Sequence, residues 1–179
     1  SVALFNGADG EWSASVDRLD KRQGVLRVEV LLRPQPADAA AAPLLAFGLI
    51  KNARLPALIE KATELGAAEL QPVLTQHCQR LGGLNLPRLQ AIATEAAEQS
   101  GRLDVPTLRE PLPLSAFLDG WEPRRPLLVC DERGGAPPLS RRLPSSEPSG
   151  AAAPGVGVLV GPEGGFSPAE FALLEAHEA

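Results

Sequence analysis

Residues 155–179 constrain the fold more than any other part of the chain. An apolar run, predicted to be a strand, ends at Val160 and passes directly into the glycine-rich turn of residues 161–165. Ser167 and Glu170 then have the spacing of a capping box at the start of a helix. A strand, a glycine turn and a capped helix in this order are typical of α/β sheets, which present ligands at the carboxyl ends of their strands.

The turn itself, Gly-Pro-Glu-Gly-Gly, differs from the common phosphate-binding loops. No lysine and serine or threonine follow its glycines as in a P-loop, and the dinucleotide pattern G-x-G-x-x-G is absent at this turn. Gly164 and Gly165 allow a ligand to approach the backbone closely, and Glu163 adds a carboxylate. The turn therefore suits an uncharged nucleoside or a cationic cofactor, although on its own it is equally consistent with a tight connection that binds nothing.

The elements predicted before this segment fall into two groups. Strands are predicted at residues 2–5, 12–19 and 25–32, followed by a linker at 33–43. Strands and helices then alternate, which predicts a mostly parallel sheet covered by helices. The strands of this second part are predicted at 44–50, 69–75, 126–131 and 155–160, its helices at 54–65 and 85–100, with Asn85 as a cap, and a surface loop at 136–155.

Composition limits the class of protein. No apolar run approaches the roughly 20 residues that span a bilayer, and the first residues do not resemble a signal peptide, so we expect a cytoplasmic protein. Two cysteines and two histidines predict neither a disulfide framework nor a metal site. The net charge of −5 does not by itself indicate a nucleic-acid-binding protein, but local basic patches can coexist with an acidic total.

Several segments together resemble one family. Residues 160–167, V-G-P-E-G-G-F-S, are similar to the signature of the RsmE-type SPOUT methyltransferases, which methylate N3 of a uridine in 16S ribosomal RNA. Residues 61–66, K-A-T-E-L-G, and 98–102, E-Q-S-G-R, match two more of its segments, and residues 2–30 resemble the later strands of its PUA-like barrel. The chain departs from the family at Pro56 and at residues 76–78.

The resemblance implies an α/β fold: a SPOUT-type trefoil-knot methyltransferase domain, a parallel sheet flanked by helices, preceded by a partial PUA-like small β-barrel domain. Residues 1–42 would form the partial PUA-like domain and linker, and residues 43–179 the methyltransferase domain without its C-terminal knot segment. It also implies S-adenosyl-L-methionine as cofactor, 16S ribosomal RNA of the small subunit as substrate, and a homodimer. Because the family continues past this point with a loop that closes over the cofactor, we expect residues 1–179 alone to bind the cofactor weakly.

The resemblance also implies site residues. We interpret Glu163 as an organiser of the loop or a ligand to polar cofactor atoms, and not as the proton acceptor. The positive charge of the cofactor is lost when the methyl group is transferred, so a carboxylate too close to that charge would hold back the reaction. Glu98 and Arg102 are predicted to position the substrate as an ion pair with helical i, i+4 spacing. The predicted cofactor-binding residues are Leu159, Val160, Gly161, Pro162, Glu163, Gly164, Gly165, Asp131 and Glu132, and the predicted RNA-binding residues are Lys51, Arg54, Lys61 and Arg102.

Three functions remain open from the sequence. The first is methylation of N3 of a uridine in 16S ribosomal RNA. The second is a related SPOUT methyltransferase that acts on another RNA, because the glycine loop identifies the cofactor better than the substrate. The third is a non-catalytic RNA-binding domain that retains the fold.

Overall fold

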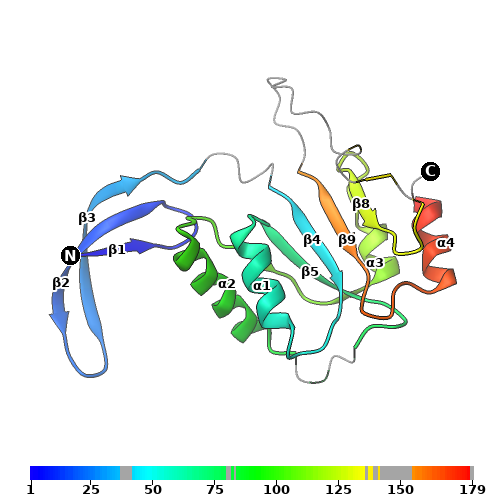
Figure 1. Ribbon diagram of the computed structural model, residues 1–179. Helices are drawn as coiled ribbons and strands as arrows, with labels where there is room; N and C mark the ends of the chain where they lie inside the picture. The colour runs from blue at the N-terminus through cyan, green and yellow to red at the C-terminus, as the bar shows by residue number, and fades with distance from the viewer. Residues whose placement is uncertain are drawn as a thin grey trace.

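A computed structural model describes residues 1–36, 42–79, 82, 84–135, 137–138, 141 and 155–177. The centre of the predicted linker and most of the predicted loop at 136–155 lie outside these described residues. The described part of the chain forms an antiparallel sheet at the N-terminus and, after it, an α/β unit (Figure 1).

A parallel sheet is the centre of the α/β unit. Within the described residues it has six strands, ordered β6-β5-β4-β9-β8 with β7 also paired to β5, and all of its pairings are parallel. This confirms the predicted parallel sheet. The strands are β4 (Leu44–Gly48), β5 (Glu69–Leu74), β6 (Thr107–Leu108), β7 (Leu112–Pro113), β8 (Leu127–Cys130) and β9 (Gly157–Val160).

Helices cover both faces of this sheet (Figure 1). Helices α1 (Leu55–Glu64) and α2 (Leu86–Ser100) lie on one face, and α3 (Leu114–Asp119) and α4 (Pro168–His177) lie on the other. The sequence analysis predicted α1, α2 and α4 but not α3, β6 or β7. These missed elements have six residues or fewer, too short for a hydrophobic period to be recognised.

Side-chain caps define the starts of two helices as predicted. Asn85 Oδ1 accepts a hydrogen bond from the Arg88 N–H at 3.0 Å at the start of α2. At α4 the capping box is formed, because Glu170 accepts from the Ser167 N–H at 2.8 Å and Ser167 Oγ accepts from the Glu170 N–H at 3.3 Å. Helix α1 ends at Glu64, one residue before the predicted bound, and Leu65 after it is 85% exposed.

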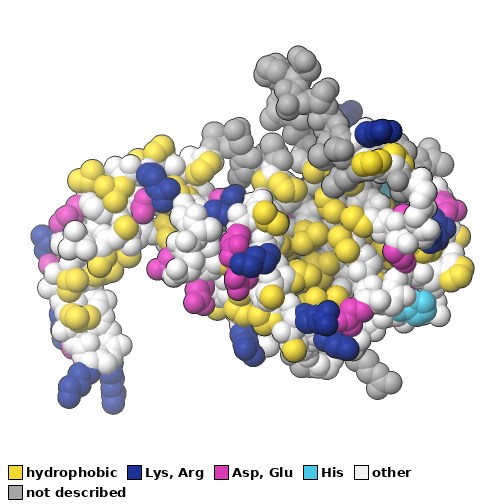
Figure 2. Space-filling model, in the orientation of Figure 1, with side chains coloured by type: hydrophobic (Ala, Val, Ile, Leu, Met, Phe, Trp, Pro, Cys, Tyr) yellow, Lys and Arg dark blue, Asp and Glu magenta, His cyan; other side chains and the backbone are white. Residues whose placement is uncertain are grey.

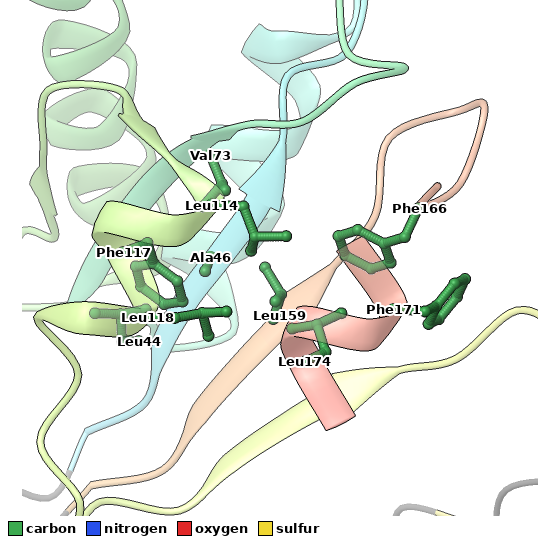
Figure 3. Close-up of a cluster of buried hydrophobic side chains, with 10 residues drawn as sticks. All are labelled: Leu44, Ala46, Val73, Leu114, Phe117, Leu118, Leu159, Phe166, Phe171 and Leu174. Atoms are coloured by element: carbon green, nitrogen blue, oxygen red, sulfur yellow. The ribbon is translucent and has the colours of Figure 1, made fainter. Parts of the chain in front are cut away.

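Ten buried side chains form the core between the sheet and the pair α3 and α4 (Figure 3). Leu159 of β9 lies in the middle of this cluster and is completely buried. Phe166 and Phe171 meet edge to face, with ring centroids 5.6 Å apart. The cluster also contains Leu44, Ala46, Val73, Leu114, Phe117, Leu118 and Leu174. It therefore anchors both ends of the glycine loop, through Leu159 before it and Phe166 after it.

The N-terminal strands form an open antiparallel sheet in the order β1-β2-β3. They are β1 (Val2–Phe5), β2 (Glu11–Leu19) and β3 (Gly24–Arg33), close to the predicted bounds. Several of their apolar side chains are exposed, among them Val16 at 51% and Val28 at 55%. The sheet extends away from the α/β unit (Figure 1), and Gln35 links the two parts by donating to the carbonyl oxygens of Gly7 and Leu103 at 3.2 and 3.3 Å.

The described residues contain neither a candidate membrane span nor a candidate metal-binding group. None of the helices there combines the length and apolarity that crossing a membrane requires. Nor do three or more histidine, cysteine, aspartate or glutamate side chains gather there in a way that would hold a metal ion.

Candidate functional site

The glycine loop, residues 161–165, follows β9 at the edge where the carboxyl ends of the parallel strands meet. Its contact with the neighbouring strand β4 is unusually close. A Cβ atom at Gly48, the last residue of β4, would lie 2.6 Å from both Cδ and the backbone nitrogen of Pro162. A side chain at position 48 would therefore displace the loop, so the loop position depends on this glycine.

Polar contacts from three other segments hold the loop. At the start of α1, Arg54 forms an ion pair with Glu163, with 3.7 Å between Nη1 and Oε1. After β5, His77 Nδ1 lies 3.1 Å from the carbonyl oxygen of Gly164. After β8, Glu132 Oε1 accepts a hydrogen bond from the Phe166 N–H at 3.0 Å. The loop is thus tied to residues that follow two strands and to one that precedes a helix.

Glu170 does more than complete the capping box. This carboxylate is 9% exposed, and its Oε1 accepts a hydrogen bond from the Gln76 N–H at 2.7 Å. Its Oε2 accepts from the Ser167 N–H at 2.8 Å. One side chain of α4 therefore joins the segment after β5 to the end of the glycine loop, a link that the sequence analysis did not predict.

Asp131, predicted to bind the cofactor, is paired with Arg133. Arg133 Nη2 lies 2.8 Å from Asp131 Oδ2 and 3.2 Å from Glu175 Oε1 of α4, and its guanidinium carbon lies 3.6 Å from the ring centroid of Phe171. Hydrogen bonds from the side chain and the backbone of Arg133 lower the pKa of Asp131 from its ordinary value. These contacts connect the turn after β8 with α4.

Three further features fit a ligand beside the loop. Cys130 and Val160 end neighbouring strands as register partners, and both are exposed, Val160 to 38%. Apolar side chains gather on the face that carries β4 and β9 (Figure 2). Thr75 Oγ1, at the end of β5, is buried without a hydrogen-bond partner among the described residues. The site thus combines apolar surface, backbone groups and one unsatisfied hydroxyl.

The predicted site residues divide between two edges of the sheet. Lys51 and Arg54 follow β4 and lie at the same edge as the glycine loop. Lys61 lies near the other end of α1, where its Nζ is 2.8 Å from both Glu60 and Glu64. These two carboxylates raise the pKa of Lys61 above its ordinary value.

The predicted ion pair between Glu98 and Arg102 does not form. Helix α2 ends at Ser100, so Arg102 lies beyond the helix, and its Nη2 pairs with Asp104 at 2.6 Å. Its guanidinium packs against Gly66 at the far end of α1. Glu98 and Arg102 therefore lie at the amino ends of the strands, away from the glycine loop, and their predicted part in catalysis receives no geometric support within one chain.

A second hollow, of about 310 Å³, lies between the turn after β1 and helix α2. Its side-chain amides are already engaged, because Gln90 donates to the carbonyl oxygen of Pro106 and accepts from the Leu108 N–H. It is therefore a weaker candidate for a ligand site than the surroundings of the glycine loop.

Comparison with known proteins identifies the family of this chain. Residues 40–179 match the model of the RNA methyltransferase domain family. The chain belongs to this family. A curated relative from Rickettsia conorii, ribosomal RNA small subunit methyltransferase E, is 30% identical over 178 residues, which cover 99% of this chain and 69% of the relative.

Two solved structures of similar proteins contain a cofactor. A proposed methyltransferase from Legionella pneumophila in complex with SAM has a TM-score of 0.80 and 28% identity, over 98% of this chain and 70% of that chain. A ribosomal RNA small subunit methyltransferase E from Neisseria gonorrhoeae, bound to S-adenosyl methionine, has a TM-score of 0.79 and 25% identity, over 99% of this chain and 72% of that chain. Both structures match 98% or more of this chain, so the similarity includes strands β1–β3, which precede the residues matched by the family model.

Proposed function

We propose that this protein transfers the methyl group of S-adenosylmethionine to N3 of a uridine in 16S ribosomal RNA of the small subunit. The observation that carries the proposal is the glycine loop at the carboxyl edge of the sheet, held by residues from other segments of a chain in the RNA methyltransferase family. The relatives named for a small-subunit activity or crystallised with S-adenosylmethionine support the choice of substrate and cofactor.

The residues at the loop suit this cofactor. Backbone groups of Gly164 and Glu163 can bind polar atoms of a nucleoside, and Val160 and Cys130 offer surface to an adenine ring. The Thr75 hydroxyl, which has no hydrogen-bond partner among the described residues, can donate or accept a hydrogen bond. When bound, S-adenosylmethionine supplies an electrophilic methyl group on a positively charged sulfur. Arg54 beside Glu163 offsets the charge of this carboxylate, which supports its interpretation as a loop organiser.

The acceptor atom sets the remaining demands on the site. Uracil N3 carries a proton and becomes nucleophilic only when that proton is removed or shared, so a hydrogen-bond acceptor must face it. The nucleotide must also be held at near-attack distance, which requires contacts with its phosphate groups. We assign these contacts to Lys51 and Arg54, because they lie beside the loop and neither is enclosed by two carboxylates as Lys61 is.

The trefoil knot, a partial PUA-like barrel for β1–β3, a homodimer and a cytoplasmic location complete the proposal. These parts of the proposal rest on the family resemblance. The opposite edge of the sheet carries Glu98, Lys61 and Arg102. These residues could contact RNA only if the RNA reaches that edge, or if the site is shared with a second copy of the chain.

Methyl transfer from labelled S-adenosylmethionine to ribosomal RNA, catalysed by the full-length protein, tests the proposed function. We expect label in the small-subunit RNA and at N3 of one uridine, located by nuclease digestion and mass spectrometry. Large-subunit RNA serves as the control substrate. Label at another position or in another RNA would replace the substrate in the proposal, and absence of any cofactor binding would favour a non-catalytic RNA-binding domain.

Replacement of Lys51 by alanine should weaken RNA binding without affecting the cofactor. One lost phosphate contact is expected to reduce the slope of log affinity against log salt concentration by about 1. Lys61→Ala is the matched control, because Lys61 is also exposed but is already paired with Glu60 and Glu64. Binding isotherms at several salt concentrations measure both variants, and an equal change in the two slopes would contradict the assignment.

A further inference from the structure

Glu132 and the glycine loop fit each other in two ways. Its Oε1 accepts the hydrogen bond from the Phe166 N–H at 3.0 Å. The same oxygen occupies the position that a Cβ atom at residue 165 would need, closer than the 3.0 Å limit that real Cβ contacts respect. Gly165 also has a φ of +68°, a conformation that side chains disfavour. The carboxylate can therefore reach Phe166 only because residue 165 has no side chain.

We propose that Glu132 is a positioning residue for methyl transfer, acting on the backbone of the glycine loop and not as a ligand of the cofactor. The inference rests on the proposed function. Glu132 follows β8, whereas Gly165 and Phe166 follow the adjacent strand β9. The hydrogen bond therefore joins the segments that follow the carboxyl ends of two neighbouring strands.

The bond to Glu132 is the middle one of three hydrogen bonds donated by consecutive N–H groups at the end of the loop. The Gly165 N–H donates to the Pro162 carbonyl oxygen at 2.9 Å, which closes the turn from within. Glu132 then fixes the next peptide group, at Phe166, and Glu170 fixes the one after it, at Ser167. The N–H groups of Gly165, Phe166 and Ser167 are thus all directed at acceptors within the protein.

A ligand role for Glu132 fits these contacts less well. Its Oε1 is already engaged by Phe166. A free carboxylate beside the sulfonium group would also stabilise the charge that disappears during transfer, and so would favour the bound substrate over the transition state. We therefore expect the rate of methyl transfer to depend more on the length of the residue 132 side chain and the position of its acceptor oxygen than on its negative charge.

Three substitutions at this position separate reach from charge. Glu132→Gln keeps an acceptor oxygen at the same distance, and we expect kcat and cofactor affinity to stay within about threefold of the wild type. Glu132→Ala removes the acceptor, and Glu132→Asp keeps the charge but shortens the reach, so each should lower kcat by roughly tenfold or more. Glu122→Ala, at an exposed carboxylate after α3, is the matched control. Equal losses in Glu132→Gln and Glu132→Asp would overturn the proposal in favour of a role for the charge.

A double-mutant cycle with Gly165→Ala tests the steric part of the inference. The single Gly165→Ala variant should weaken cofactor binding by roughly tenfold, since the new Cβ displaces the Glu132 side chain and strains the backbone. Adding Glu132→Ala to the Gly165→Ala chain removes the clash. The double variant should therefore lose much less cofactor affinity than the product of the losses in the two single variants. Multiplicative losses would show that the two residues act independently and would overturn the inference.

Calorimetry with S-adenosylmethionine and thermal unfolding should be carried out on the wild type and on each variant, all as full-length proteins. If the wild type binds no cofactor, the proposed function fails, while the coupling between Glu132 and Gly165 is still measurable in the unfolding temperatures of the cycle. If the wild type binds and the cycle shows no coupling, only the inference on Glu132 fails. Should Glu132→Ala not fold, the contrast between Glu132→Gln and Glu132→Asp, and a cycle with Glu132→Asp, decide the question.

Discussion

Replacement of Gly48 by alanine should weaken binding of S-adenosylmethionine by roughly tenfold to a hundredfold. The new Cβ would lie 2.6 Å from the backbone nitrogen of Pro162, and a backbone atom cannot move aside as the end of a long side chain can. The glycine loop must shift instead, and displacements near 1 Å at a reacting site cost about a hundredfold in rate. Calorimetry gives the affinity, and the rate of methyl transfer gives the effect on kcat.

Gly120→Ala is the matched control for this prediction. Gly120 follows α3, its φ of −89° suits any residue, and the nearest atom to an added Cβ is the Ala116 carbonyl oxygen at 3.4 Å. This variant should bind the cofactor as the wild type does. Unchanged affinity in Gly48→Ala would mean that the loop tolerates displacement and that the cofactor is bound elsewhere.

Replacement of Leu159 by alanine should lower the free energy of unfolding by about 3 kcal/mol, with a typical range of roughly 2–5 kcal/mol for a buried leucine. Leu159 is completely buried in the middle of the cluster between the sheet and α3 and α4, and its loss leaves a cavity that rigid strands cannot close. For a domain of this size, the corresponding decrease in melting temperature is roughly 10 °C. Urea unfolding followed by circular dichroism measures the change.

Leu173→Ala on α4 provides the comparison, because this leucine is 46% exposed. We expect a loss below about 1 kcal/mol there. Similar losses in both variants would contradict the central position of Leu159. Because the Leu159 side chain is completely buried in the core, only the backbone of this predicted cofactor-binding residue could contact a cofactor.

The sequence predicted the elements whose signals are local. The capping box of Ser167 and Glu170 and the Asn85 cap could be recognised because each lies within four residues of its partner. Apolar residues at helical spacing predicted α1 and α2, and apolar runs predicted most strands of the parallel sheet. Helix α3 has six residues and begins directly after Pro113, so neither length nor period distinguished it from a loop.

The contacts that hold the candidate site were not predictable in this way. Glu132 and Phe166 are 34 residues apart, and His77 and Gly164 are 87 residues apart. Such pairs depend on the order of strands in the sheet, and this order could not be predicted from the sequence alone. The pair of Glu98 and Arg102 shows the opposite error, because a spacing of four residues indicates an ion pair only where the helix continues, and here Gly101 ends it in a left-handed conformation.

The ties of the glycine loop also bear on the thermodynamics of cofactor binding. The N–H groups of Gly165, Phe166 and Ser167 all donate to acceptors within the protein, so folding of the domain already orders this backbone. A ligand that enters a preorganised loop loses little affinity to conformational entropy. The heat-capacity change on binding should then reflect the apolar surface of the ligand and its pocket, with little contribution from folding of the loop.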